Sequence, residues 1–279
     1  MKSSIAVWKE RIEAHDAQSL RARGDRPEEE DWWSSLAGGF RADPRRTDDP
    51  VVNLLTAWVT PESTVLDVGG GAGRYALPLA LVCRRVTVVE PSPAMVAQLH
   101  EGARAAGIEN VAVVQAGWED AEVEPADIVL CANVVYGVSD IAPFVTKLDR
   151  FAKDRVAVVV YMDAPMSMLS PLWMAVHEEE RIELPALPEL LPVLWEMGIY
   201  ANVEMLPAVA PRSAPNMEAA IGFARHMLHV QAGTEKDQRL LEAARELAVE
   251  TPEGVTLRRN AARPLGVVWW RPENGRTVS

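Results

Sequence analysis

The chain has 279 residues, of which 48% are hydrophobic, and a formal net charge of −12 at pH 7. This length and composition predict a soluble globular protein, and the acidic charge argues against nucleic acid as a partner. The absence of an apolar run of about eighteen residues excludes a membrane-spanning helix. With 2 cysteines, we expect neither a disulfide framework nor a metal site, and we expect a cytoplasmic location.

Residues 1–60 are predicted to form a helical cap ahead of the main domain, 61–279. From Ser63 onward the chain alternates apolar runs with helix-like segments. Runs this continuously apolar are typical of parallel strands covered on both faces, so the pattern predicts a doubly wound α/β sheet. The expected strands are 64–69, 85–91, 110–117, 126–135 and 155–162, and the expected helices between them are 73–83, 92–107 and 139–153.

The alternation loosens after Met162. Residues 163–187 are rich in Met, Leu and Trp, and they resemble a lid inserted over an apolar pocket. The same composition is also typical of a packed core or of a dimer interface, so a homodimer is an alternative prediction. Residues 212–262 are predicted to make a helical excursion, and 199–207 and 264–272 are predicted to be the last strands.

The stretch VLDVGGGAGR, residues 65–74, places four glycines behind Asp67. Such a run at a strand-to-helix junction indicates a ligand that approaches the backbone. Two interpretations compete. Gly71, Gly73 and Ala76 fit the G-x-G-x-x-A dinucleotide fingerprint, with Glu90 as the acid that binds ribose. An ionised Asp67 would repel a pyrophosphate, however, and would favour a ligand with an ammonium or sulfonium group.

The segments VLDVGGGAGR, VTVVEPSPAM, VQAGWED and ADIVLCANVVYGVSD, in this order, resemble the class I S-adenosylmethionine (SAM)-dependent methyltransferases. The resemblance covers residues 50–162. It implies a Rossmann-like, seven-stranded, mostly parallel sheet with the last strand antiparallel, plus helical insertions. It also implies SAM as cofactor, S-adenosylhomocysteine (SAH) as product, and in-line methyl transfer to a small apolar or aromatic metabolite. The alternatives are a nicotinamide-dependent oxidoreductase and a SAM-binding protein that acts without chemistry, through a partner.

By the same resemblance, the cofactor-binding residues follow the first four strands: Asp67, Gly69, Gly71, Gly73, Glu90, Met95, Trp118, Glu119 and Asn133. Asp67 would order the amine of the methionine end, and Glu90 would accept both ribose hydroxyls. Met95 and Trp118 would contact the adenine, although packing explains both residues as well. Glu119 would accept from the exocyclic amine of the adenine.

Methyl transfer needs a general base only if the acceptor must lose a proton. The catalytic group is therefore unknown, and the three candidates are His177, Tyr136 and Asp163. His177 lies in the insertion, Tyr136 follows the fourth strand and Asp163 follows the fifth. Arg181 stands where a zinc-binding H-E-x-x-H motif would have its second histidine, so we expect no zinc there.

Overall fold

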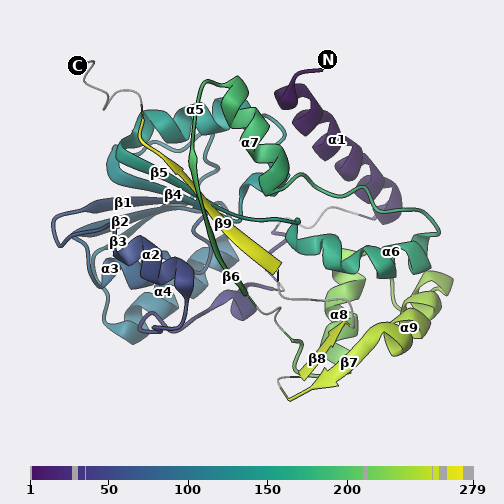
Figure 1. Cartoon of the computed structure of the whole chain (residues 1–279). Helices are drawn as coiled ribbons and strands as arrows, with labels where there is room; N and C mark the ends of the chain where they lie inside the picture. The colour runs from purple at the N-terminus through teal and green to yellow at the C-terminus, as the bar shows by residue number, and fades with distance from the viewer. Residues whose placement is uncertain are drawn as a thin grey trace.

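A seven-stranded sheet forms the centre of the computed structural model, which describes residues 2–26, 31–34, 36–209, 213–252, 254–257 and 263–272. Its strand order is β3-β2-β1-β4-β5-β9-β6 (Figure 1). Neighbouring strands are parallel except that β9 runs antiparallel to both β5 and β6. This confirms the predicted fold. The strands are β1 Thr64–Val68, β2 Arg85–Val89, β3 Val111–Val114, β4 Ala126–Ala132, β5 Ala152–Tyr161, β6 Asn202–Val209 and β9 Arg263–Trp270.

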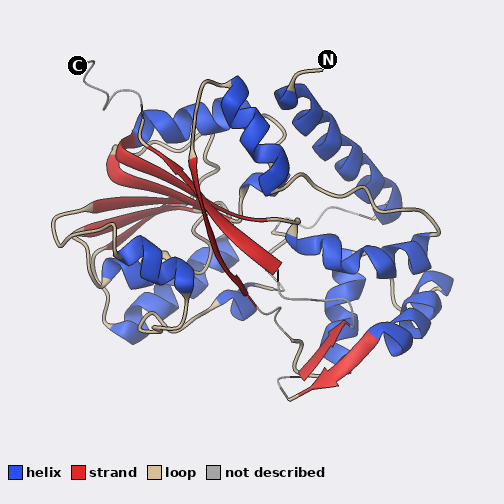
Figure 2. Cartoon of the chain, in the orientation of Figure 1, coloured by secondary structure: helices blue, strands red, loops and turns tan. Residues whose placement is uncertain are grey.

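Helices cover both faces of the sheet (Figure 2). On one face, α1 (Ser4–Arg23), α5 (Ile141–Phe151) and α7 (Leu187–Glu196) bury their apolar residues in one core. On the other face, α2 (Pro50–Thr56), α3 (Ala76–Ala80) and α4 (Pro93–Ala106) form a second core. Central strands buried from both sides explain the continuously apolar runs in the sequence.

The helix after β2 begins and ends as its sequence predicts. The Ser92 side chain accepts from the Met95 N–H, Pro93 occupies the first turn, and Gly107 ends α4 in the left-handed conformation. The helix expected at 73–83 is shorter, because α3 spans only Ala76–Ala80 and the glycine loop continues up to it.

A smaller unit lies beside the carboxyl ends of the strands (Figure 1). It contains η3 (Pro165–Leu169), α6 (Ser170–His177), α8 (Met217–Met227) and α9 (Glu235–Leu247), which share a third apolar cluster. The expected 163–187 insertion and 212–262 excursion thus pack against each other. Residues 212, 253 and 258–262 of the excursion lie outside the described residues.

The sequence pattern predicts a helical excursion over residues 212–262, but the structure shows that part of it is a β-hairpin. After α9 the chain forms a two-stranded hairpin, β7 (Ala248–Thr251) with β8 (Gly254–Leu257). Gly254 has a φ of 127°, and a Cβ atom there would overlap the Ala214 carbonyl oxygen. The backbone therefore requires glycine, and β-branched residues at Val249 and Thr251 favour the strand. Among the described residues, no helix is long and apolar enough to cross a membrane.

Candidate active site

The glycine loop after β1 folds closely around one carboxylate. Gly69, Gly71 and Gly73 have φ angles of 69°, 53° and 82°, which L side chains rarely adopt. A Cβ atom on Gly70 would lie 2.8 Å from Oδ2 of Asp67, and one on Gly69 would overlap Val134. The loop therefore requires glycine for both its conformation and its space.

Asp67 is 1% exposed, and neither of its carboxylate oxygens has a hydrogen-bond partner among the described residues. Burial, and then the nearby charge of Glu90, raises the pKa of Asp67 from 3.8 to about 7. The Ala76 N–H lies close enough to oppose this shift, but it does not reach hydrogen-bond geometry. A buried carboxylate without a donor is costly, so it indicates a cationic or N–H-bearing ligand.

Glu90 follows β2 and faces the same loop. Its Oε2 accepts from the Gly71 N–H at 2.9 Å, and its Oε1 accepts from the Ser92 N–H at 2.9 Å. These bonds fix the carboxylate, although burial still raises its pKa above the usual range. Each oxygen keeps a lone pair for a further donor.

Asn133 follows β4 and has a left-handed φ of 59°. Its side-chain Oδ1 is buried and has no hydrogen-bond partner among the described residues. Since β1 pairs with β2 on one side and β4 on the other, the structure brings Asp67, Glu90 and Asn133 to neighbouring strand ends. Met95 is buried beside the loop, where its Sδ would lie 3.9 Å from a Cβ atom on Gly71.

Trp118 points into the protein core. It is 4% exposed, its ring lies edge-on to Phe151 with centroids 5.6 Å apart, and the Lys147 Nζ lies 4.6 Å from its centroid. Its indole N–H donates to the Phe144 carbonyl at 3.4 Å. This is the packing role that the sequence left open, whereas Glu119 beside it is exposed.

The three candidate bases have different surroundings. The buried Tyr136 hydroxyl accepts from the Tyr161 N–H at 2.7 Å, and burial raises its pKa. His177 contacts the Leu228 carbonyl at 2.9 Å, and burial lowers its pKa. Asp163 is exposed.

The segment before residue 41 covers the glycine loop. Asp31 accepts from the Ser92 hydroxyl at 2.9 Å and from the Ala94 N–H at 3.1 Å. Further along, Ala37 of η1 (Ala37–Phe40) packs with Ala72 and Met95. We call residues 31–34 and 36–40 the covering segment.

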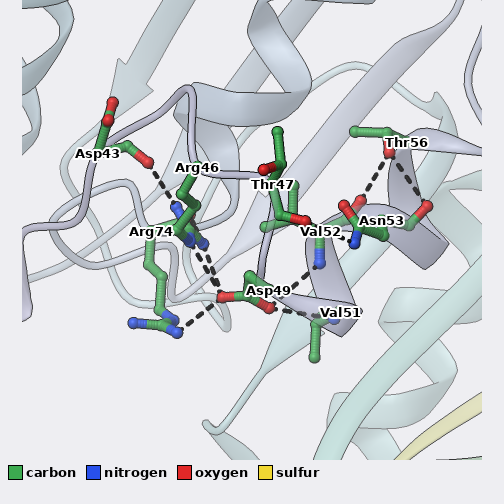
Figure 3. A network of polar contacts seen from close by, with 9 residues as sticks. All are labelled: Asp43, Arg46, Thr47, Asp49, Val51, Val52, Asn53, Thr56 and Arg74. Carbon is green, nitrogen blue, oxygen red and sulfur yellow. Dashed lines mark hydrogen bonds and ion pairs between the residues drawn. The ribbon is translucent and has the colours of Figure 1, made fainter.

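Asp49 holds the outer side of the loop (Figure 3). Its Oδ2 accepts from Arg46 at 3.0 Å and from Arg74 at 2.7 Å, while its Oδ1 caps α2 through the N–H groups of Val51 and Val52. Arg46 also donates to the Arg74 carbonyl at 2.8 Å. The network therefore ties the end of the glycine loop to the start of α2.

A cavity of about 620 Å³ lies between α1, α6, the segment after α6 and the end of α8. Trp32, Met166, Leu169 and Trp173 form much of its apolar wall. The Trp32 ring lies 4.0 Å from the His226 ring, centroid to centroid. Because Asp31 contacts Ser92 and the next residue lines the cavity, the covering segment joins the cavity to the start of α4, beside Glu90.

The sequence analysis missed the polar residues of this cavity. His15 contacts the Ile182 carbonyl, and Gln18 exchanges hydrogen bonds with the same segment after α6. Arg181 donates to both side chains. The available signal was the spacing of Arg11, His15 and Gln18, which places three polar residues on one helix face.

The site fits SAM on the evidence of its own atoms. The partnerless Asp67 carboxylate suits a ligand cation, the glycine loop leaves room that a Cβ atom would fill, and Asn133 offers a further acceptor. A phosphate-bearing dinucleotide would place like charge beside Asp67 and Glu90. No group of three or more metal-ligating side chains occurs in the part of the chain that the structure describes.

Residues 65–169 match the sequence family described as "Methyltransferase domain". An uncharacterised protein of Haemophilus influenzae is 24% identical over 218 residues, covering 76% of this chain and 77% of that protein. The 23S rRNA (uracil(1939)-C(5))-methyltransferase RlmD of Chromohalobacter salexigens is 40% identical over 67 residues, which are 23% of this chain but 14% of that enzyme.

The fold has relatives among solved structures. A proposed methyltransferase from Bacillus halodurans C-125 superposes with a TM-score of 0.53 at 16% identity, covering 80% of this chain and 97% of that one. The structural likeness shows the shared fold, and the family match favours the methyltransferase interpretation of the glycine run. Residues 65–169 thus form a methyltransferase domain, and SAM is its cofactor.

Proposed function

We propose that this enzyme methylates a small, largely apolar or aromatic molecule held in the cavity beside the covering segment. The observation that carries the proposal is the step from Asp31 to Trp32. Asp31 is bonded to Ser92 and Ala94 at the start of α4, two residues after Glu90, and Trp32 lines the cavity. An acceptor lying against Trp32 would therefore be close to the cofactor end of β2.

In this proposal the strand ends bind and orient the cofactor, which supplies a methyl group on a sulfonium. Asp67 pairs with the ammonium of the methionine end, and Asn133 accepts along the same end. Glu90 accepts from the ribose hydroxyls. Met95 packs at the adenine, with Glu119 as the acceptor for its exocyclic amine, while Trp118 supports the core. Orientation and exclusion of water are the main catalytic contributions, because the reaction is a displacement.

A small-molecule acceptor fits the charge of the chain better than RNA does. A formal charge of −12 repels a polyanion, and the match to the rRNA enzyme covers 14% of its length. We retain residues 163–187 as the lid, since Met166, Leu169 and Trp173 come from this segment. Free, buried Cys83 and Cys131 agree with the proposed cytoplasmic location.

The test uses SAM labelled in its methyl group, incubated with the purified protein and a cell extract divided into small molecules and RNA. We expect label in the small-molecule fraction, and none when Glu90→Ala replaces the wild type. Label found only in RNA would refute the proposed acceptor. Calorimetric titration with SAH, with NADH as control, shows in the same preparation that the cofactor site is intact.

A further inference from the structure

One guanidinium in the cavity wall lacks a carboxylate partner. Arg181 donates to Gln18 Oε1 at 3.1 Å, Ser19 Oγ at 2.7 Å and His15 Nε2 at 2.7 Å, all of them neutral acceptors. Within the described residues, no acidic side chain forms an ion pair with it. Arginine has five N–H donors, so two of them remain for a ligand.

The surrounding contacts hold this guanidinium in place. Its carbon lies 3.8 Å from the centroid of the Trp173 ring, which stacks beneath it. His15 must accept from Arg181 through Nε2, and its Nδ1–H therefore donates to the Ile182 carbonyl at 2.6 Å. A planar cation fixed on an aromatic face is well suited to bind a planar anion.

Arg181 is the cation of the cavity wall whose charge a bound ligand would meet. Burial lowers the pKa of both His15 and His229 to about 4, so both are neutral at pH 7. Arg181 remains charged, because burial lowers its pKa only to about 10. Arg23 and Asp16 also line the cavity with opposite charges. Glu183 and Glu179 act on Arg181 from nearby as well. Arg181 is therefore the positive charge that a ligand meets, and these acids disfavour a dianion relative to a monoanion.

We infer that the molecule bound in this cavity carries a carboxylate, which Arg181 binds while the apolar body lies against Trp32 and Leu169. This inference rests on the proposed function, because it specifies the acceptor of the same cavity. It assigns Arg181 to substrate recognition and gives it no part in the displacement.

Benzoate and benzamide are suitable probes, since they differ only in charge and hydrogen bonding at one group. Ligand-observed NMR on the full chain saturated with SAH would measure their dissociation constants. We expect benzoate to bind about tenfold more tightly than benzamide, the ratio typical of a hydrogen bond to a charged group. Arg181→Met should abolish this preference, and Arg181→Lys should retain part of it. Arg21→Met is the matched control, because Arg21 is on α1, the helix that packs against Arg181, but pairs with Glu179 and does not line the cavity.

Equal binding of benzoate and benzamide to the wild type would overturn the inference, and so would failure of both to bind. Tighter binding of phenyl phosphate than of benzoate would overturn the inference that the ligand is a monoanion. The comparison within the wild type stands even if Arg181→Met fails to fold. Loss of SAH binding by the wild type, in contrast, would contradict the cofactor site and with it the proposed function.

Discussion

At the scale of single residues, we expect the buried carboxylate of Asp67 to set the pH dependence of cofactor binding. Without ligand, its pKa is raised to about 7, and a bound cation favours the ionised form. SAH affinity should therefore fall by up to about tenfold per pH unit below 7, with one proton released on binding. Calorimetry in two buffers of different ionisation enthalpy measures both effects. Asp67→Asn should bind SAH more weakly with no such slope, and a flat wild-type profile would contradict the assignment.

The same residue has the opposite effect on the ligand-free protein. Its folded pKa lies above the usual 3.8, so the folded state binds more protons than the unfolded state between these values. The free energy of unfolding should thus decline as pH rises from about 4 to about 7 and then level off, by at most about 4 kcal/mol from this group. Asp67→Asn removes the decline. Urea unfolding of the wild type and of Asp67→Asn at pH 5 and pH 8 measures this decline. If the free energy of unfolding changes equally with pH in both proteins, Asp67 does not cause it.

Glu90 differs from Asp67 because both of its oxygens already accept from backbone N–H groups. In Glu90→Gln the amide NH₂ must face Gly71 or Ser92, and one hydrogen bond becomes a clash of donors. We expect SAH binding weaker by roughly 1.5–3 kcal/mol. Glu101→Gln is the control, since Glu101 is on α4 but pairs with Arg41 at the surface. An unchanged affinity in folded Glu90→Gln would remove Glu90 from the site.

At the scale of elements, Asp31 ties the covering segment to the start of α4, and we expect this contact to help retain the cofactor. The Ser92 hydroxyl and the N–H groups of Ala94 and Trp33 outweigh burial and keep the pKa of Asp31 below its usual range. Asp31→Ala removes the three contacts, so SAH should dissociate about tenfold faster. Stopped-flow fluorescence measures the rate, with the exposed Asp25→Ala as control. Equal rates in the two variants would show that the segment does not retain the cofactor.

Elements with local signals could be predicted from the sequence, whereas the cavity could not. Ser92, Pro93 and Gly107 mark the ends of α4 within sixteen positions. The glycine run led to the prediction that Asp67 and Glu90 bind the cofactor, which stays a prediction. The cavity instead depends on contacts such as the one between His15 and Ile182, which are 167 positions apart. Sequence periodicity predicts that a helix face is polar, but it does not predict which distant segment packs against that face.

At the scale of the whole molecule, the smaller unit has its own apolar cluster, separate from the two cores of the sheet. Leu172, 2% exposed, belongs to this cluster, and Leu99, 0% exposed, belongs to the core beneath α4. Leu172→Ala should cost about 2–5 kcal/mol in the smaller unit. In this variant the rate of amide hydrogen exchange should rise in α6, α8 and α9, while the affinity for SAH stays near that of the wild type.

Leu99→Ala is the matched control, because the same substitution in the core of the sheet should accelerate exchange in β1 and β2 and weaken SAH binding. A difference between the two variants would bear on function. It would show that the smaller unit, which lines the cavity, can open while the sheet and the glycine loop stay folded. Product could then leave the cavity without unfolding the glycine loop. If Leu172→Ala raises exchange equally in β1 and in α6, the molecule unfolds as one cooperative unit, and release must instead depend on motion of the covering segment alone.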